Sequence, residues 1–189
     1  MTNHKNNLIE YGKNLSEGIK LIDFKNLTNA IRVLKNKIKK NKKIFVCGNG
    51  GSAAITNHYI ADYLKLLREK SGVKIKIFSL SDNVELITAI SNDIDFNKIF
   101  SYQLESLANK NDLLLLISSS GNSQNIINAL KFAKKNLITT IGFSGFDGGY
   151  LKKNCDIPLH FENNSYQLSE DFHHILMHFI MNELINELK

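Results

Sequence analysis

The apolar residues at the start of the chain recur at helical spacing. In residues 1–22 they are Leu8, Tyr11, Leu15, Ile19 and Ile22, and in residues 24–41 they are Leu27, Ile31, Leu34 and Ile38. Positions three or four apart share one face of a helix. The pattern predicts two amphipathic helices, over 1–22 and 24–41.

Beyond residue 42, short apolar runs alternate with longer helical stretches. We expect strands at 44–47, 73–80, 113–118, 138–143 and 157–161. Helices are expected over about 17 residues after the first strand and at 84–91, 96–108, 123–135 and 170–188. The run 113–118 lacks alternation, as a fully buried strand does. Lys74 and Lys76 alternate with apolar residues and place the strand 73–80 at a sheet edge.

Strands that alternate with helices predict the α/β class, with a five-stranded parallel sheet covered on both faces and two leading helices. A length of 189 residues fits one domain, 1–189. Ligands of such sheets bind beyond the carboxyl ends of the strands, where the strand order reverses. A site is therefore expected in the loops after Cys47, Leu80, Ser118 and Phe143.

The composition is that of an ordinary globular protein, with 43% apolar and 22% charged residues. No apolar run reaches the roughly 18–20 residues of a membrane helix, and the polar amino terminus does not resemble a signal peptide. Cys47 and Cys155 form neither a disulfide framework nor a zinc knuckle. We expect a soluble cytoplasmic protein with no membrane partner.

The net charge of +6 raises the question of nucleic-acid binding. Only Arg32 and Arg68 among the 24 basic residues are arginines, the residue that such surfaces favour. The lysine-rich run 35–43 falls at the end of a predicted helix, where cations complement the helix dipole. No nucleic-acid partner is expected.

The first candidate binding loop, which we call the glycine loop, is residues 47–54, Cys-Gly-Asn-Gly-Gly-Ser-Ala-Ala. Its glycines let the backbone approach a ligand, and free N–H groups at a helix start can bind an anion. Ser52 can cap that helix or bind a phosphate oxygen. The dinucleotide pattern G-x-G-x-x-A also fits, but the acidic residue expected after the second strand is missing. A tight turn without a ligand is the alternative.

The second candidate, the serine loop, is residues 118–123, Ser-Ser-Ser-Gly-Asn-Ser. Four hydroxyls and a glycine at a helix start can bind a phosphate monoester without lysine or arginine. A serine-rich capping loop is the alternative. Two phosphate-type loops on neighbouring strands favour a ligand site.

Histidines and carboxylates recur on two helices. His58 and Asp62 are four residues apart and share a face, so they can chelate a metal, act as an acid–base pair or form a helix-surface pair. On the last helix Glu170, His174 and His178 form a stripe with the same spacing. A carboxylate–histidine row among apolar residues favours a functional site.

These motifs, with Ser91-Asn-Asp93, resemble the SIS (sugar isomerase) domain family and within it the phosphoheptose isomerase family. The resemblance covers nearly the whole chain. It implies a doubly wound, flavodoxin-like fold, one zinc ion per active site, and homotetramers with active sites between subunits. Residues 1–41 would serve oligomer packing, and residues 42–189 would form the sugar-phosphate-binding core.

The resemblance also assigns residues by motif. The substrate would contact Asn49, Gly50, Gly51, Ser52, Asn92, Asp93 and Glu170, and its phosphate Ser118, Ser119, Ser120 and Ser123. The metal would be held by His58, Asp62, Glu170 and His178. Asp62 would act as the catalytic base and His178 as the acid.

Three positions depart from the family pattern: Asp62 replaces Glu, Glu170 replaces Gln, and Leu66 replaces Arg. Aspartate retracts the carboxylate by roughly 1.5 Å. Glu170 and His178 are separated by about 12 Å of helix rise, so they can hardly hold one ion together. Either a neighbouring subunit supplies one of the two, or His174 is the ligand instead.

The resemblance implies an aldose–ketose isomerase that converts sedoheptulose 7-phosphate to D-glycero-D-manno-heptose 7-phosphate for lipopolysaccharide or capsule heptose. One alternative is a non-catalytic SIS protein that binds a sugar phosphate or a replication initiator. The other is an isomerase for a different sugar phosphate.

Overall fold

A computed structural model describes residues 3–189; Met1 and Thr2, part of the first predicted helix, lie outside the described residues. The first half of the chain forms α1 (His4–Leu21), α2 (Phe24–Lys39), β1 (Lys43–Gly48), α3 (Gly51–Asp62), the π-helical turn η1 (Tyr63–Leu67), α4 (Arg68–Ser71), β2 (Lys76–Ser79) and α5 (Val84–Ile90). The second half forms η2 (Ser91–Asp95), η3 (Phe96–Lys98), α6 (Ile99–Leu107), β3 (Leu113–Ser118), α7 (Gln124–Lys135), β4 (Thr139–Ser144), α8 (Gly149–Asn154), β5 (Ile157–His160) and α9 (Tyr166–Leu188). Within this range the helices are too short or too polar to cross a lipid bilayer.

The five strands form one parallel sheet in the order β2-β1-β3-β4-β5, which confirms the predicted fold class. β2 lies at an edge, as its lysines predict, but it is four residues long, shorter than the predicted run 73–80. The register pairs Lys43, the first residue of β1, with Lys76, so residues 73–75 have no strand beside them. This strand order reverses direction between β1 and β3.

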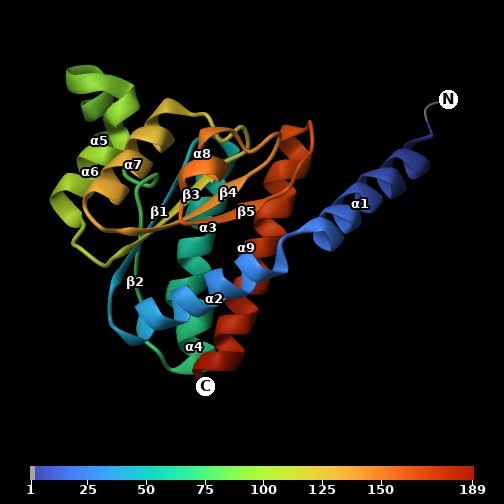
Figure 1. The fold of residues 1–189 in the computed structure, drawn as a ribbon, viewed down its shortest axis with the longest axis horizontal. Coiled ribbons are helices and arrows are strands. Elements are labelled where there is room, and N and C mark those ends of the chain that lie inside the picture. Colours follow the sequence, from blue (N-terminus) through green and yellow to red (C-terminus); the bar gives the residue numbers. More distant parts are fainter. Residues whose placement is uncertain (1–2) are drawn as a thin grey trace.

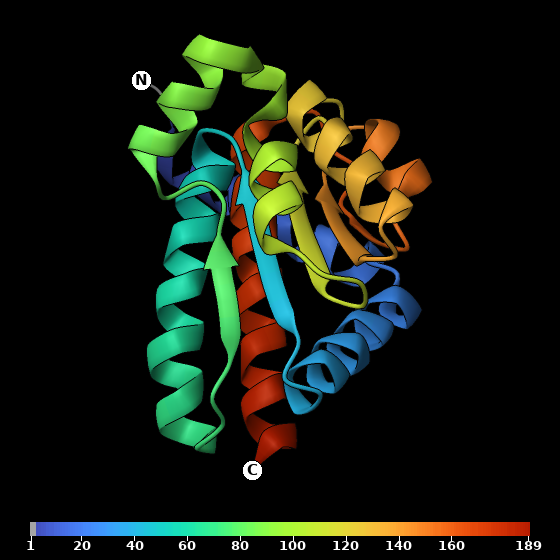
Figure 2. The same ribbon diagram turned by 90° about the vertical axis from the view of Figure 1, so that its left-hand side faces the viewer.

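Helices cover both faces of the sheet (Figure 2). α2, α3 and α9 pack on one face, where alternate strand residues such as Ile44 and Val46 are buried. α6, α7 and α8 pack on the other, over Phe45 and Cys47. All six residues of β3 are buried, as the uninterrupted apolar run predicts. The sheet therefore holds the carboxyl ends of β1 and β3 side by side in a rigid frame.

Two helices differ in extent from the prediction. α9 begins at Tyr166, four residues before the predicted start, because the Ser165 hydroxyl accepts a hydrogen bond from the Leu168 amide at 3.2 Å and caps the helix. The helical segment after the glycine loop runs without a break from α3 through α4, longer than predicted, and ends at Gly72, whose φ of 73° is the left-handed conformation typical of a helix end.

α1 extends away from the body of the molecule, whereas α2 lies against it (Figure 1). The predicted apolar face of α2 is buried, but that of α1 is only partly covered, and Leu8 is 73% exposed. The Tyr11 hydroxyl donates a hydrogen bond to Asp171 Oδ2 at 2.7 Å, which ties α1 to α9. In a single chain, then, α1 presents apolar side chains to solvent.

Candidate active site

The glycine loop and the serine loop meet where the strand order reverses. The glycine loop leaves β1 and enters α3 through Gly50, whose φ of 52° lies in the left-handed region that glycine adopts without strain. The serine loop leaves β3 and enters α7 at Ser123, which occupies the N-cap position of α7 without a capping hydrogen bond from its hydroxyl. Both helices therefore begin at this edge of the sheet, with their first N–H groups available to an anion.

A reciprocal pair of amides joins the two loops. Asn49 Nδ2 donates to Asn125 Oδ1 at 2.8 Å, and Asn125 Nδ2 donates back to Asn49 Oδ1 at 2.9 Å. Asn125 is buried and was not among the predicted site residues. Its only signal in the sequence is its place just after the serine loop, at the start of a helix.

A cavity of about 130 Å³ lies between the loops. It is lined by Asn49, Ser52, Ile117, Ser118, Ser119, Ser120, Ser123, Tyr166 and Glu170. A water occupies roughly 30 Å³ in the liquid, so the cavity has room for a phosphate-sized group. Seven of the predicted site residues thus share one cavity, together with Tyr166, which the sequence pattern did not single out.

The hydroxyls of the serine loop are available to a ligand. Ser119 is buried, and its Oγ has no hydrogen-bond partner among residues 3–189. The hydroxyls of Ser118 and Ser123 lie 3.3 Å apart, and that of Ser120 accepts from the Asn122 amide at 3.2 Å. A buried hydroxyl without a partner is costly unless a ligand or water bonds to it. This favours a polar ligand in the cavity.

Glu170 lies in this cavity, in contact with the start of α3. A Cβ built on Gly51 would lie 2.3 Å from a Glu170 carboxylate oxygen, so the carboxylate occupies this position only while residue 51 lacks a side chain. Burial, and then the nearby charge of Asp171, raises the pKa of Glu170. Glu170 therefore joins the predicted substrate-contacting residues of the glycine loop.

Asn92 and Asp93 do not line this cavity. They belong to η2, above the same edge of the sheet (Figure 2), and both are exposed. Asn92 Nδ2 donates to Asp93 Oδ1 at 2.8 Å, so in one chain the two side chains bond to each other. Their predicted contact with substrate stays a prediction.

A second group of side chains lies farther along α3 and α9, which pack against each other. His58 Nε2 lies 3.3 Å from His178 Nε2. Asp62 Oδ2 lies 3.4 Å from His58 Nε2 and 3.3 Å from His178 Nε2. Three of the predicted metal-binding residues therefore meet within one chain, at the corners of a nearly equilateral triangle.

His174 belongs to the same group, one turn before His178 on α9. Its ring centroid lies 4.7 Å from that of His178 and 4.9 Å from that of His58. One ring nitrogen from each of the three histidines lies within 4.8 Å of the others. Burial, and then the neighbouring imidazoles of His178 and His58, lowers the pKa of His174. We call His58, Asp62, His174 and His178 the histidine–aspartate cluster.

The donor set and spacing of this cluster fit a zinc ion. Imidazole nitrogens and carboxylate oxygens are ordinary zinc ligands, with bond lengths of roughly 2.0–2.2 Å. In a tetrahedral site, bonds of that length place the donor atoms about 3.3–3.5 Å apart. The three separations of 3.3, 3.4 and 3.3 Å in the triangle agree with this. The cluster can therefore hold a metal as well as act as an acid–base group.

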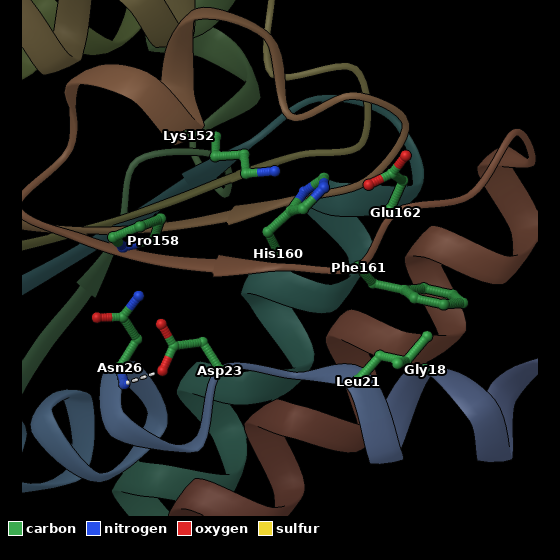
Figure 3. A pocket seen from close by; sticks show the side chains of 9 residues that line it. All are labelled: Gly18, Leu21, Asp23, Asn26, Lys152, Pro158, His160, Phe161 and Glu162. Carbon is green, nitrogen blue, oxygen red and sulfur yellow. Dashed lines mark hydrogen bonds between the residues drawn. The ribbon is translucent and has the colours of Figure 1, made fainter.

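A separate hollow of about 400 Å³ lies between the leading helices and the β5 edge of the sheet (Figure 3). Lys152, His160 and Glu162 form its upper wall, and Asp23 and Asn26, at the start of α2, lie opposite them. Its lining residues differ from those of the cavity at the loops. None of the predicted site residues lines this hollow.

Comparison with known proteins agrees with the geometry. Residues 9–145 match the SIS domain family. The phosphoheptose isomerase of Aliarcobacter butzleri is 39% identical over 163 residues, covering 86% of this chain and 85% of that protein. The solved structure of a phosphoheptose isomerase from Francisella tularensis has a TM-score of 0.86 at 26% identity, covering 99% and 100% of the two chains. That of Neisseria gonorrhoeae has a TM-score of 0.83 at 27% identity, covering 95% of each.

The fold and the loops define a SIS domain. More narrowly, the chain belongs to the phosphoheptose isomerase family, which confirms the resemblance of its motifs. It is an enzyme of the aldose–ketose isomerase class.

Proposed function

We propose that this chain converts sedoheptulose 7-phosphate to D-glycero-D-manno-heptose 7-phosphate. The observation that carries the proposal is the placement of the histidine–aspartate cluster beyond the serine-lined cavity on the same two helices. Ser52 and Glu170 line the cavity, and His58 and His174 follow them by six and four residues. These intervals correspond to about 9 and 6 Å of helix rise.

That separation suits a long sugar phosphate. With carbon–carbon bonds of roughly 1.5 Å, a seven-carbon chain extends over roughly 8 Å from its phosphorylated end to its carbonyl end. The phosphate at C7 would bind the serine hydroxyls and helix N–H groups, while C1 and C2 would extend to His58 and His174, the members of the cluster nearest the cavity along α3 and α9, with Asp62 and His178 one helical turn farther on. The names of the relatives, all phosphoheptose isomerases, support the same chain length.

The reaction moves one proton between adjacent carbons. Asp62, as the base, removes the proton from C1 of the ketose and returns it to C2, while His178 donates a proton to one sugar oxygen and takes one from the other. Binding energy from the remote phosphate holds the reacting carbons beside these groups.

The residues of the cluster fit the metal that the resemblance implies. His58, Asp62 and His178 would hold it, with Glu170 as the predicted fourth ligand. A bound zinc ion supplies a Lewis acid for the sugar oxygens. The protein side chains orient the substrate and transfer its protons.

We infer that the working form is a homotetramer with active sites between subunits, in which residues 1–41 pack against other copies and residues 42–189 bind the sugar phosphate. The projecting α1 with its exposed Leu8 supports this. The bond from Tyr11 to Asp171, next to Glu170, places α1 close to the cavity. The free thiols of Cys47 and Cys155 suit the cytoplasm, where the product would supply heptose for a surface glycan.

Turnover of a set of ketose phosphates tests the substrate. Sedoheptulose 7-phosphate, fructose 6-phosphate and ribulose 5-phosphate would be offered to the purified protein with added zinc. We expect the highest kcat/KM with the seven-carbon sugar, because of these sugars it is the longest and extends farthest from the serine-lined cavity toward the histidine–aspartate cluster. Faster turnover of a shorter sugar would assign a different substrate, and binding without turnover of any sugar would favour a sugar-phosphate-binding protein.

A further inference from the structure

His174 is a nitrogen donor without a protein partner. Its Nε2 atom is buried and has no hydrogen-bond partner among the described residues, although the ring lies between His58 and His178. A buried ring nitrogen left without a partner is unfavourable. This nitrogen is therefore free to bind a ligand, and the donor atoms of the neighbouring side chains indicate a metal ion.

The neighbours form one face of a tetrahedron. His58, Asp62 and His178 supply three donor atoms separated by 3.3–3.4 Å, as around one zinc ion. A zinc ion bound by these three donors in tetrahedral geometry would take a fourth ligand. His174 offers an additional donor, because one of its ring nitrogens lies within 4.8 Å of ring nitrogens of both other histidines.

Glu170 of the same chain is poorly placed to fill that position. It precedes His178 by eight residues, about 12 Å of helix rise, and its carboxylate packs against Gly51 in the cavity of the serine loop. To reach the triangle, the Glu170 side chain would have to leave its place beside Gly51 in the cavity of the serine loop. His174 would need only an adjustment of its ring, since it lies one turn from His178 on the same face of α9 and one of its ring nitrogens is within 4.8 Å of those of His58 and His178.

We propose that His174 is the fourth protein ligand of the metal in this chain and that Glu170 remains in the sugar-phosphate pocket. The proposal rests on the metal-dependent function argued above. Three neutral imidazoles and one carboxylate leave a zinc site with a net charge of +1, whereas ligation by both Asp62 and Glu170 would neutralise it. A more positive site attracts the oxygens of an anionic substrate more strongly.

Zinc affinity, measured without any sugar, tests this assignment. A chromophoric chelator would compete for zinc with the full-length protein, with His174→Ala and with Glu170→Ala. We expect His174→Ala to weaken zinc binding by at least about a hundredfold, more than the loss of an outer-shell group causes. Glu170→Ala, which removes no ligand, should change it by less than the roughly tenfold that loss of an outer-shell group causes. His160→Ala, which removes a half-buried histidine outside the cluster, is the matched control and should bind zinc normally.

Zinc-edge X-ray absorption counts the imidazoles directly. We expect three in the parent protein and in Glu170→Ala but two in His174→Ala. The proposal is overturned if His174→Ala keeps the parent's zinc affinity and imidazole count, or if Glu170→Ala loses zinc as strongly as His174→Ala does. His174→Gln, compared with the parent by circular dichroism and urea unfolding, separates a lost ligand from a lost fold. Because neither measurement uses a substrate, the result does not depend on the isomerase assignment, which is tested by the turnover of ketose phosphates.

Discussion

His58 and His178 are 120 residues apart in the chain, yet their Nε2 atoms lie 3.3 Å from each other. One is on α3 and the other on α9, two helices packed on the same face of the sheet. Asp62 completes the triangle by the i, i+4 spacing on α3. Helix packing within one chain therefore brings together these three side chains, which are predicted to act as acid, base and metal donors.

The Asn49–Asn125 pair is expected to fix the distance between the two loops. Asn125→Ala removes both amide hydrogen bonds and leaves the Asn49 amide without its partner, so we expect a loss of about 1–3 kcal/mol in unfolding free energy. Because Asn49 lines the cavity, the affinity for inorganic phosphate should fall as well. Urea unfolding and phosphate titration would measure these effects. Unchanged phosphate affinity would show that the pair does not position the loops.

Gly51 is expected to respond to substitution through its contact with Glu170. The added Cβ of Gly51→Ala would displace the Glu170 carboxylate, so the substitution should raise the unfolding free energy by less than the roughly 1 kcal/mol that Gly→Ala gives in an open helix. In a Glu170→Ala background the contact is gone, and the same substitution should give the full gain. Gly12→Ala on α1, where a Cβ meets no atom within 4 Å, is the matched control and should stabilise its helix. Urea unfolding would measure these effects, and equal gains in both backgrounds would contradict the contact.

Most of the frame and part of the site could be predicted from local pattern. Periodicity gave the strands and their alternation with helices, and the i, i+4 spacing joined His58 to Asp62. Spacing along one helix could not show whether Glu170 or His174 lies beside His58 and Asp62, because the answer depends on which turn of α9 packs against α3. Asn125 and Tyr166 were not predicted as site residues, because a single polar or aromatic residue produces no periodic pattern. The capping by Ser165 likewise became visible only in the structure.

Acid is expected to destabilise the fold through His173. Burial lowers the pKa of His173 to about 4, while an unfolded histidine titrates near 6.5. Below about pH 6.5 the unfolded chain therefore binds a proton that the folded chain does not, and stability falls as the pH falls.

From pH 7 to pH 5 this histidine should cost about 2 kcal/mol of unfolding free energy. Urea unfolding with a chelator present would measure it, and His173→Leu should show a correspondingly smaller pH dependence. His4→Gln on the exposed surface of α1 is the control. An identical pH dependence in His173→Leu and the parent would reject the assignment.

Substitutions on the exposed face of α1 are expected to weaken self-association. Leu8→Glu places a charge where a partner chain would bury an apolar side chain. We expect a smaller species by analytical ultracentrifugation, with the fold intact by circular dichroism. Lys13→Glu, also on the exposed surface of α1, should leave the mass unchanged. A parent protein that sediments as a monomer would argue against oligomer packing through α1.

Proton transfer at the histidine–aspartate cluster can be followed by NMR of sedoheptulose 7-phosphate in deuterated water. The zinc-loaded parent should interconvert ketose and aldose and introduce deuterium at C1 or C2. Asp62→Asn and His178→Ala should each slow this by at least about a hundredfold, while the serine loop still binds phosphate. Interconversion at the parent rate in both variants would contradict the proposed mechanism.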